Sequence, residues 1–344
     1  MLTEIENLWQ QGKFLKAAFD EYKKCIEAVF GHAHEILQTP HGIPPEFHVE
    51  LGDISKEFYS IKKNLFSTLF QSVYHLMNIE EPRRLFYGKL NHLFRIWVTS
   101  ADNLLDNEDK IVVPIKIGGS SRIMRQVISI MLADRILKNI TDEAVFNGIL
   151  TEQESSLIVH KSLQILLPSA AEEASEESGI TSRPDAEYVL NTIHRLKTGL
   201  LFQIPFLGPD NIEYGLDVKI VDMCKQGLMN FGLGCQIIDD IRDIAKDYLE
   251  MRHNYVLSHI YHSYPVYVSK LDEVEPLMEN SSNIFHLFPE VTYPAAQRAM
   301  DLLVDGLLSL GKAGLGIDRK TARFLSLGIF ETLGVGELTK CLSA

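Results

Sequence analysis

Apolar residues recur at helical spacing along most of this chain. Over residues 53–77, for example, Ile61, Leu65 and Leu69 follow one another at intervals of four, which is the spacing of one helix face. Prolines and glycines interrupt the pattern, as in the segment QTPHGIPPEFH near residue 40. The pattern predicts helices over 1–35, 53–77, 82–108, 120–139 and 150–167, one from 184 through HRLKTGLLFQI, a long one from 209 that carries FGLGCQIIDDIRDIAKD, and three or four more over 255–344.

No segment alternates between apolar and polar residues for long enough to indicate a sheet, and no repeat period is visible. The pattern therefore predicts an all-α protein, a single large bundle of roughly a dozen helices. The proline-rich segment near residue 40 is too short for a linker, so we expect one domain over residues 1–344.

Composition and charge narrow the possible environments and partners. The net charge of -13 argues against nucleic acid or an anionic membrane as partner, because both attract basic surfaces. No window contains the roughly 18 apolar residues of a membrane helix, so no integral membrane segment is expected. The N-terminus lacks the basic and apolar regions of a signal peptide. Four scattered cysteines indicate reduced thiols, and we therefore expect a cytoplasmic protein.

Acidic side chains crowd one face of the predicted long helix. Gln236, Asp239, Asp240, Asp243 and Asp247 fall at i, i+3, i+4, i+7 and i+11. Like charges one turn apart destabilise an isolated helix by roughly 0.2–0.5 kcal/mol per pair, so this stripe needs neutralising cations. A divalent metal would supply them.

A second acidic pair, Asp102 and Asp106, ends the predicted helix over 82–108. Carboxylates at one-turn spacing on two helices can face each other across the mouth of a bundle. Such oxygen ligands suit Mg²⁺, which is commonly shared between carboxylates and the phosphate oxygens of a substrate. The chemistry that this arrangement supports is departure of a phosphate or diphosphate group, with metal and basic side chains stabilising the leaving group.

Three motifs in these residues resemble those of the trans-isoprenyl diphosphate synthases. CQIIDDIRD over 235–243 is similar to the second aspartate-rich motif of that family. DNLLD over 102–106 is similar to the first, DDxxD, with Asn103 in its second position. Lys197 and Thr198 in RLKTG match the KT motif that lies between the two. The resemblance implies the class I isoprenoid synthase fold, a prenyl diphosphate substrate and a homodimer.

The resemblance also implies a role for each matching residue. The cofactor would be Mg²⁺, three ions per site, with Asp102, Asp106, Asp239 and Asp243 as ligands and Asp240 beside them. The diphosphate or the nascent cation would contact Lys197, Thr198 and Gln236, and Lys246 would extend the site. Val98 and, one turn deeper, Arg95 lie beneath Asp102 on the same helix, where they would contact the substrate; a salt-bridged core arginine is the alternative for Arg95.

Two departures from the family pattern bear on the activity. Chain-elongating members carry an arginine pair after the first motif and a Gly-Lys-x-x-Arg-Pro element upstream, which together bind the homoallylic diphosphate. This chain has no arginine over 107–111 and keeps only Lys62 and Lys63 upstream. A second diphosphate would therefore lack most of the basic side chains that bind it in the family. We therefore expect a terpene synthase that ionises one allylic prenyl diphosphate and cyclises or quenches the carbocation.

Three alternatives stay open. A head-to-tail trans-prenyltransferase would use Lys62, Lys63 and Lys110 as cations, and would condense an allylic diphosphate with isopentenyl diphosphate. A head-to-head synthase of the squalene or phytoene type would use Asp243 and Asp247 as a DxxxD motif. A non-catalytic scaffold subunit would keep the fold and lose the chemistry. Outside these motifs, we expect the glutamates of AEEASEESG to lie on a solvated helix face.

Overall fold

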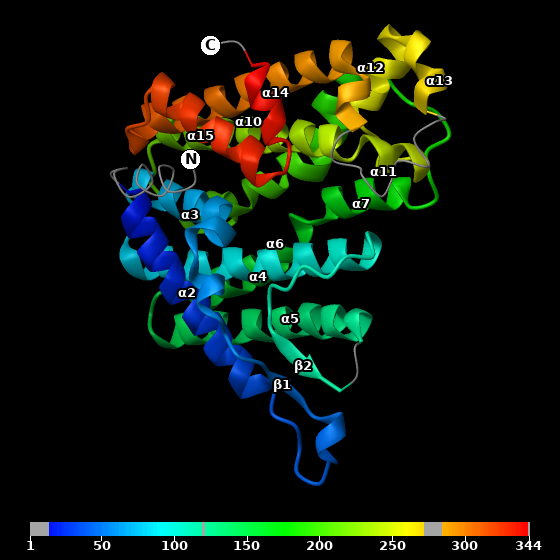
Figure 1. The fold of residues 1–344 in the computed structure, drawn as a ribbon. Coiled ribbons are helices and arrows are strands. Elements are labelled where there is room, and N and C mark those ends of the chain that lie inside the picture. Colours follow the sequence, from blue (N-terminus) through cyan, green and yellow to red (C-terminus); the bar gives the residue numbers. More distant parts are fainter. Residues whose placement is uncertain (1–13, 119–120, 272–283, 343–344) are drawn as a thin grey trace. The chain divides into compact units, whose positions relative to one another are not determined.

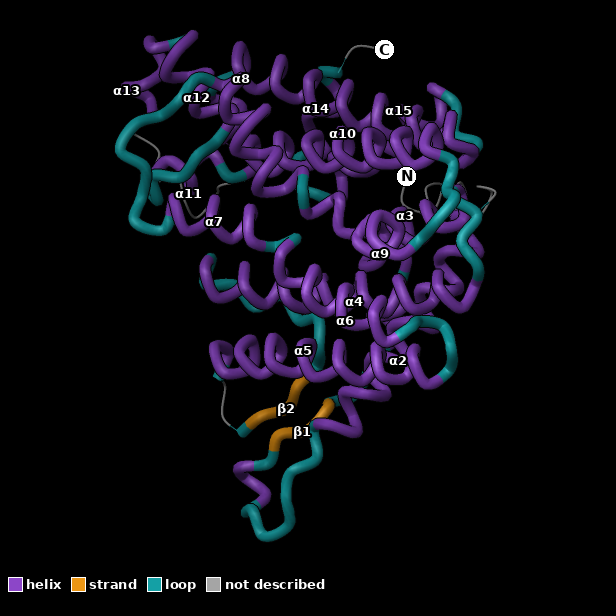
Figure 2. The backbone as a smooth tube through the Cα atoms, turned by 180° about the vertical axis from the view of Figure 1, so that it is seen from behind, coloured by secondary structure: helices purple, strands orange, loops and turns teal. Residues whose placement is uncertain are grey.

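The computed structural model describes residues 14–118, 121–271 and 284–342, and most of them are helical. The β structure among the described residues is one antiparallel pair, β1 (Val49–Leu51) and β2 (Ile115–Ile117), in which Val49 lies opposite Ile117 (Figure 2). The all-α class expected from the sequence is therefore confirmed.

The chain divides into two compact units. Among the described residues, the N-terminal unit consists of residues 14–118, 121–162 and 204–216, and the C-terminal unit of residues 163–203, 217–271 and 284–342. The single domain expected over the whole chain stays a prediction.

Four long helices make the N-terminal unit. The helix α4 (Glu81–Leu105) packs against α5 (Arg122–Phe146), and α2 (Leu15–Ile36) packs against both α3 (Ile61–Leu76) and α4 (Figure 1). Their apolar faces form its core, as the helical spacing requires. The shorter elements that belong to or end in this unit are η1 (Pro45–Phe47), η2 (Lys56–Tyr59), α6 (Glu152–Gln164) and α9 (Leu207–Ile212).

A buried polar cluster ties three helices of the N-terminal unit together. The Glu21 carboxylate of α2 accepts hydrogen bonds from Arg84 Nη2 at 2.6 Å, from His75 Nε2 at 3.0 Å and from Gln71 Nε2 at 3.1 Å. Burial by itself would raise the pKa of Glu21, but these hydrogen bonds lower it to about 2. Glu21 is therefore ionised inside the bundle and joins α2 to α3 and α4.

The C-terminal unit is organised around α10 (Val218–Arg242) and α14 (Pro289–Leu310), which lie side by side (Figures 1 and 2). A Cβ atom on Gly306 would come within 2.6 Å of the Gly227 carbonyl oxygen. Only glycine therefore permits the two backbones to approach so closely at this crossing. The other elements that belong to or begin in this unit are α7 (Leu167–Glu176), α8 (Ala186–Tyr188), η3 (Val189–Ile193), η4 (Arg195–Gly199), η5 (Leu201–Phe206), α11 (Ile244–Leu249), α12 (Tyr255–Ser263), η6 (Pro265–Tyr267), α13 (Val268–Leu271), η8 (Gly311–Leu315), α15 (Arg319–Thr332) and η9 (Gly336–Lys340).

Several helix boundaries differ from the sequence expectation. The helix expected from residue 53 begins at Ile61, because the Ser60 side chain accepts the Lys63 N–H and caps it. The long helix expected from 209 begins at Val218, where Asp217 is the cap, and α9 is a separate short helix. The first 13 residues of the expected 1–35 helix lie outside the described residues.

The segment expected to continue as one helix from 184 is also divided. It consists of α8, two wider helical turns over 189–193 and 195–199, and a tight turn that contains Pro205. A proline lacks the backbone N–H that a regular helix uses, which accounts for the change of winding near Pro205. The wider turn over 195–199 carries Lys197 and Thr198.

Candidate active site

The acidic stripe is divided because α10 ends within it. Asp243 is the C-terminal cap of α10, with φ -100° and ψ 18°, and α11 begins at the next residue. The backbone bonds continue across this break, from Asp243 N–H to the Asp239 oxygen and from Asp247 N–H to the Asp243 oxygen, both at 2.9 Å. Asp247 and Lys246 therefore lie on α11, while Gln236, Asp239 and Asp240 lie on α10.

Arg242 joins the two outward-facing carboxylates. Its guanidinium donates to Asp243 Oδ1 at 2.8 Å and to Asp243 Oδ2 at 2.6 Å, and it also donates to Asp239 Oδ1. The side chain of Asp239 is 41% exposed and that of Asp243 is 24% exposed. Two accessible carboxylates one turn apart are the oxygen donors that a hard divalent cation takes, so this pair fits Mg²⁺. The role of Arg242 was missed from sequence, although its i,i+3 spacing from Asp239 is a signal for an ion pair.

Asp240 differs from its neighbour Asp239 because it is buried, at 2% exposure. Its Oδ2 accepts hydrogen bonds from His194 Nε2 at 2.6 Å and from the Tyr255 N–H at 2.5 Å. Its Oδ1 accepts from Gln236 Nε2 at 3.0 Å. The carboxylate of Asp240 therefore links α10 by hydrogen bonds to His194, which precedes the KT residues, and to the first residue of α12.

Side-chain hydrogen bonds join the KT segment (Lys197 and Thr198) to the aspartate helix, α10. Thr198 Oγ1 donates to Gln236 Oε1, and Gln236 donates in turn to Asp240. Thr198, Gln236 and Asp240 come from two motifs that are far apart in the sequence, and they form one hydrogen-bonded chain inside the C-terminal unit. A chain of this kind holds each side chain in one orientation.

Lys197 lies beside two glutamates of α7. Its ammonium is 3.0 Å from Glu173 Oε1 and 3.3 Å from Glu176 Oε1. Burial by itself would lower the pKa of Lys197, but the carboxylates of Glu176, Glu173 and Glu172 raise it. Lys197 is therefore positively charged, and its side chain keeps 24% exposure.

The expectation that the glutamates of AEEASEESG are solvated is wrong for two of them. Glu172 is 7% exposed and Glu176 is 0% exposed. The physical reason is that α7 packs against the KT segment, where Ser169 Oγ donates to the Lys197 carbonyl oxygen at 3.0 Å. Glu176 Oε2 accepts the His253 N–H at 2.6 Å. Burial beside Glu176 raises the pKa of Glu172 well above its usual range.

Asp247 also lies in a polar environment. The Asn254 amide donates to Asp247 Oδ2 at 2.7 Å and to the Asp240 carbonyl oxygen at 2.8 Å, so it connects the two acids. Burial, followed by the negative charge of Asp240, raises the pKa of Asp247 well above its usual value. This environment differs from that of Asp239, which is paired with Arg242.

In the N-terminal unit, Asp102 and Asp106 lie at the end of α4. The Asp106 N–H donates to the Asp102 carbonyl oxygen at 2.8 Å. Asn103 stands in the second motif position and is buried, and its amide closes the following loop. Asn103 Nδ2 donates to the Lys110 carbonyl oxygen at 2.8 Å, and the Lys110 N–H donates to Asn103 Oδ1 at 2.9 Å. The asparagine that departs from DDxxD therefore organises the loop after the motif.

Two arginines from α5 hold the same loop, and sequence reasoning missed both. Asn107 has φ 57°, the left-handed conformation that ends many helices, and Arg122 donates to its carbonyl and side-chain oxygens. Arg125 Nη1 is 2.9 Å from both carboxylate oxygens of Asp109. The family pattern places its arginines directly after the motif, whereas these two lie in the first turn of the next helix.

Arg95 and Val98 lie on α4 and are both partly exposed. Arg95 Nη1 donates to Asn64 Oδ1 at 2.6 Å, and Arg95 also lies beside the Tyr22 hydroxyl. Asn64 is buried and also donates to the Phe58 and Ser60 carbonyl oxygens. The amide of Asn64 thus fixes the start of α3 and orients Arg95.

The site residues are thereby divided between the two units. Lys197, Thr198, Gln236 and the aspartates from 239 to 247 lie in the C-terminal unit, while Arg95, Val98, Asp102 and Asp106 lie in the N-terminal unit. The expectation that the two acidic groups face each other stays a prediction. Among the described residues, no helix is both long enough and apolar enough to span a membrane.

Comparisons with known proteins identify the fold. No protein-family model matches the sequence, and no curated protein matches it significantly. Solved structures do match over nearly the whole chain. The geranylgeranyl pyrophosphate synthase of Lactobacillus brevis has a TM-score of 0.60 at 13% identity, and covers 94% of this chain and 99% of its own.

Two further structures agree with it. The geranylgeranyl pyrophosphate synthetase of Pyrococcus horikoshii has a TM-score of 0.59 at 14% identity, and covers 93% of this chain and 98% of its own. The decaprenyl diphosphate synthase of Rhodobacter capsulatus has a TM-score of 0.58 at 14% identity, and covers 93% of this chain and 99% of its own. The chain therefore has the all-α, class I isoprenoid synthase fold of the prenyl diphosphate synthases.

Proposed function

We propose that this protein is a Mg²⁺-dependent, head-to-tail trans-prenyltransferase, which condenses an allylic prenyl diphosphate with isopentenyl diphosphate. The observation that carries the proposal is the hydrogen-bonded chain from Thr198 through Gln236 to Asp240, which places the KT segment on the aspartate helix. Its support from the fold is that the similar solved structures are described as prenyl diphosphate synthases.

The proposed Mg²⁺ ligands are Asp239 and Asp243 in the C-terminal unit and Asp102 and Asp106 in the N-terminal unit, with Asp240 held next to Asp239. Bound Mg²⁺, three ions by the family resemblance, would neutralise the charge that develops on the departing diphosphate. Arg242 keeps the Asp239 and Asp243 carboxylates side by side.

Lys197 and Thr198 are the proposed diphosphate contacts of the KT segment. Lys197 is positively charged, as its pKa shift requires, and it is suited to stabilise the anionic leaving group. Gln236 orients Thr198, and Lys246 on α11 extends the cationic side of the site. In the reaction, the C1–O bond of the allylic diphosphate breaks, a carbon–carbon bond to isopentenyl diphosphate forms, and a proton leaves the new allylic carbon chain.

The second diphosphate needs cations, and the N-terminal unit supplies a different set from the family pattern. Arg95 lies on α4 below Asp102, and Arg122 and Arg125 lie at the loop that follows Asp106, where Arg125 is paired with Asp109. We propose that Arg95 contacts the homoallylic diphosphate and that Val98 lines the path of the hydrocarbon chain. A homodimer is expected from the same family resemblance.

A terpene synthase is the second candidate, and one observation favours it. The lysines that would replace the missing arginines already have acidic partners: Lys63 Nζ is 3.1 Å from Glu57 Oε1, and Lys110 Nζ is 2.5 Å from Glu108 Oε2. Their charges are thereby partly neutralised, which weakens the binding of a second diphosphate. With only one diphosphate bound, the carbocation would be cyclised or quenched instead of elongated.

One experiment separates these candidates. The purified protein is incubated with Mg²⁺ and allylic diphosphates of increasing chain length, each with and without isopentenyl diphosphate. Prenyl transfer predicts a longer diphosphate only when isopentenyl diphosphate is present. A hydrocarbon or alcohol formed from the allylic diphosphate alone would establish the terpene synthase, a symmetric doubled hydrocarbon would indicate head-to-head coupling, and no turnover under any condition would support the scaffold.

A further inference from the structure

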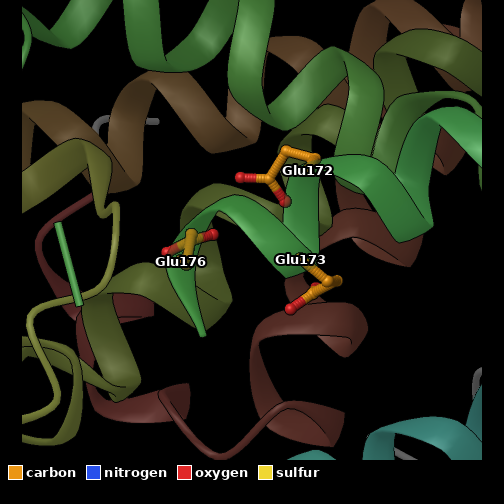
Figure 3. Close-up of side chains that lie close together, drawn as sticks. All are labelled: Glu172, Glu173 and Glu176. Atoms are coloured by element: carbon orange, nitrogen blue, oxygen red, sulfur yellow. The ribbon is translucent and has the colours of Figure 1, made fainter. Parts of the chain in front are cut away.

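Three glutamates of α7 form a carboxylate cluster that the proposed prenyl chemistry does not use. Glu172, Glu173 and Glu176 each offer a carboxylate oxygen, and these atoms lie within 4.8 Å of one another. Figure 3 shows the three side chains projecting from α7. We refer to Glu172, Glu173 and Glu176 as the α7 carboxylate cluster.

The three glutamates of the cluster differ in their hydrogen-bond and ion-pair partners. Lys197 contacts one oxygen of Glu173 and one of Glu176, and Glu176 also accepts the His253 N–H. Both oxygens of Glu172 are buried, and within the described residues neither accepts a hydrogen bond; the neighbouring group is the acid of Glu176. A buried, ionised carboxylate without a donor is costly, so Glu172 has to be neutralised, either by the proton that its raised pKa favours or by a bound cation.

We propose that the α7 carboxylate cluster binds one hard divalent cation, such as Mg²⁺, Mn²⁺ or Ca²⁺, with Glu172 as its principal ligand. With all three carboxylates ionised, the cluster carries three negative charges and Lys197 carries one positive charge. A divalent cation that displaces the proton favoured on Glu172 therefore brings the cluster to neutrality. Oxygen ligands lie at ~2.0–2.6 Å from such ions, so oxygens on opposite sides of one ion are ~4–5 Å apart. The spacing in the cluster matches that requirement.

Lys197 does not have to leave for the cation to bind. Each ionised carboxylate has about four lone-pair sites, and Lys197 uses only one oxygen of Glu173 and one of Glu176. Glu172 contributes two oxygens that accept no hydrogen bond within the described residues. The cation would therefore lie beside Lys197 and add positive charge next to it. A proton on Glu172 is the competing neutraliser, so binding has to be measured at one fixed, neutral pH.

The test is Mn²⁺ binding to the full chain without diphosphate, followed by electron paramagnetic resonance of free Mn²⁺. The variants are Glu172→Gln and Glu173→Gln in the cluster, Asp239→Asn in the aspartate stripe, and Glu177→Gln as the matched control. Glu177 follows the cluster on the chain and is exposed. We expect both cluster variants to lose one Mn²⁺ per chain, or to bind it at least tenfold more weakly. Glu177→Gln and Asp239→Asn should retain that ion.

Equal Mn²⁺ stoichiometry and affinity in Glu172→Gln and Glu177→Gln would overturn the proposal. Glutamine has the shape of a neutral glutamic acid, so Glu172→Gln is expected to fold, and its melting temperature checks this. Glu173 is less buried, so Glu173→Gln keeps the test decisive if Glu172→Gln fails to fold. The outcome is independent of the proposed enzyme activity, because absence of prenyl transfer would leave Mn²⁺ binding at α7 unchanged.

Discussion

The Asp240 carboxylate accepts a 2.6 Å hydrogen bond from His194 Nε2, and both side chains are buried. Asp239, its neighbour in the sequence, is instead exposed and paired with Arg242. Two adjacent aspartates of one motif therefore have different physical roles. Asp240 fixes the position of the helix, while Asp239 presents its carboxylate to the site.

This difference predicts that one substitution mainly lowers stability and the other mainly lowers activity. Asp240→Asn places an amide where the carboxylate accepts three hydrogen bonds, and should lower the free energy of unfolding by about 1–3 kcal/mol. Asp239→Asn removes an exposed ion pair worth ~0–1 kcal/mol, and should reduce prenyl transfer by ~100-fold or more because a proposed Mg²⁺ ligand is lost. Urea unfolding and product formation measure the two effects. A larger loss of stability in Asp239→Asn than in Asp240→Asn would contradict this assignment.

Restoring the DDxxD motif by Asn103→Asp should destabilise the folded protein. In Asn103→Asp, the buried side chain loses the amide that donates to the Lys110 carbonyl oxygen, and a carboxylate faces that oxygen instead. We expect the free energy of unfolding to fall by about 1–3 kcal/mol. Asn147→Asp, at an exposed amide that ends α5, adds the same charge and is the control. Unchanged thermal unfolding in Asn103→Asp would show that the amide does not organise the loop.

The crossing of α10 and α14 provides a test of packing. Gly306→Ala would bring Cβ within 2.6 Å of the Gly227 carbonyl oxygen and 2.9 Å of the Phe231 nitrogen, both backbone atoms. Overpacking of this kind costs about 1–3 kcal/mol, and the unfolding midpoint should fall accordingly. Gly31→Ala in α2 has no atom within 4 Å of the added Cβ, and should stabilise the protein by ~0.5–1 kcal/mol. The two alanine variants should therefore shift the midpoint in opposite directions, and equal shifts would refute the close approach.

Glu21 predicts a specific loss of stability in acid. Its pKa is about 2 in the folded chain against 4.5 ordinarily, so it stabilises the fold above pH 4.5, and that contribution disappears as the pH falls through about 2. The expected loss is on the order of 3 kcal/mol, the value that this shift represents. Urea unfolding from pH 5 to pH 2 should show a flatter dependence for Glu21→Gln than for the unmodified chain. Glu35→Gln, an exposed acid on the same helix, should keep the steep dependence.

Helical spacing in the sequence was sufficient for most of the secondary structure. The regular 3–4 spacing over α3, α4 and α5 predicted those helices, and the absence of alternation predicted the all-α class. The errors lie at the boundaries, because capping decides them: Ser60 and Asp217 each accept a backbone N–H and start a helix later than the apolar pattern does. The motif order also led to the class I isoprenoid synthase fold, which the solved structures confirm.

The sequence by itself determined which chemical groups this protein has and how they are spaced along its helices, including the carboxylates of Asp239 and Asp243 and the lysine of the KT segment. Only the tertiary structure decided which of those groups are buried and what they contact. The solvated helix face expected for the glutamates of AEEASEESG is wrong for Glu172, and spacing alone did not distinguish buried Asp240 from exposed Asp239. The physical reason is that burial depends on which surface packs against a helix, and local spacing carries no information about a partner such as α7 or α12 that lies far away along the chain.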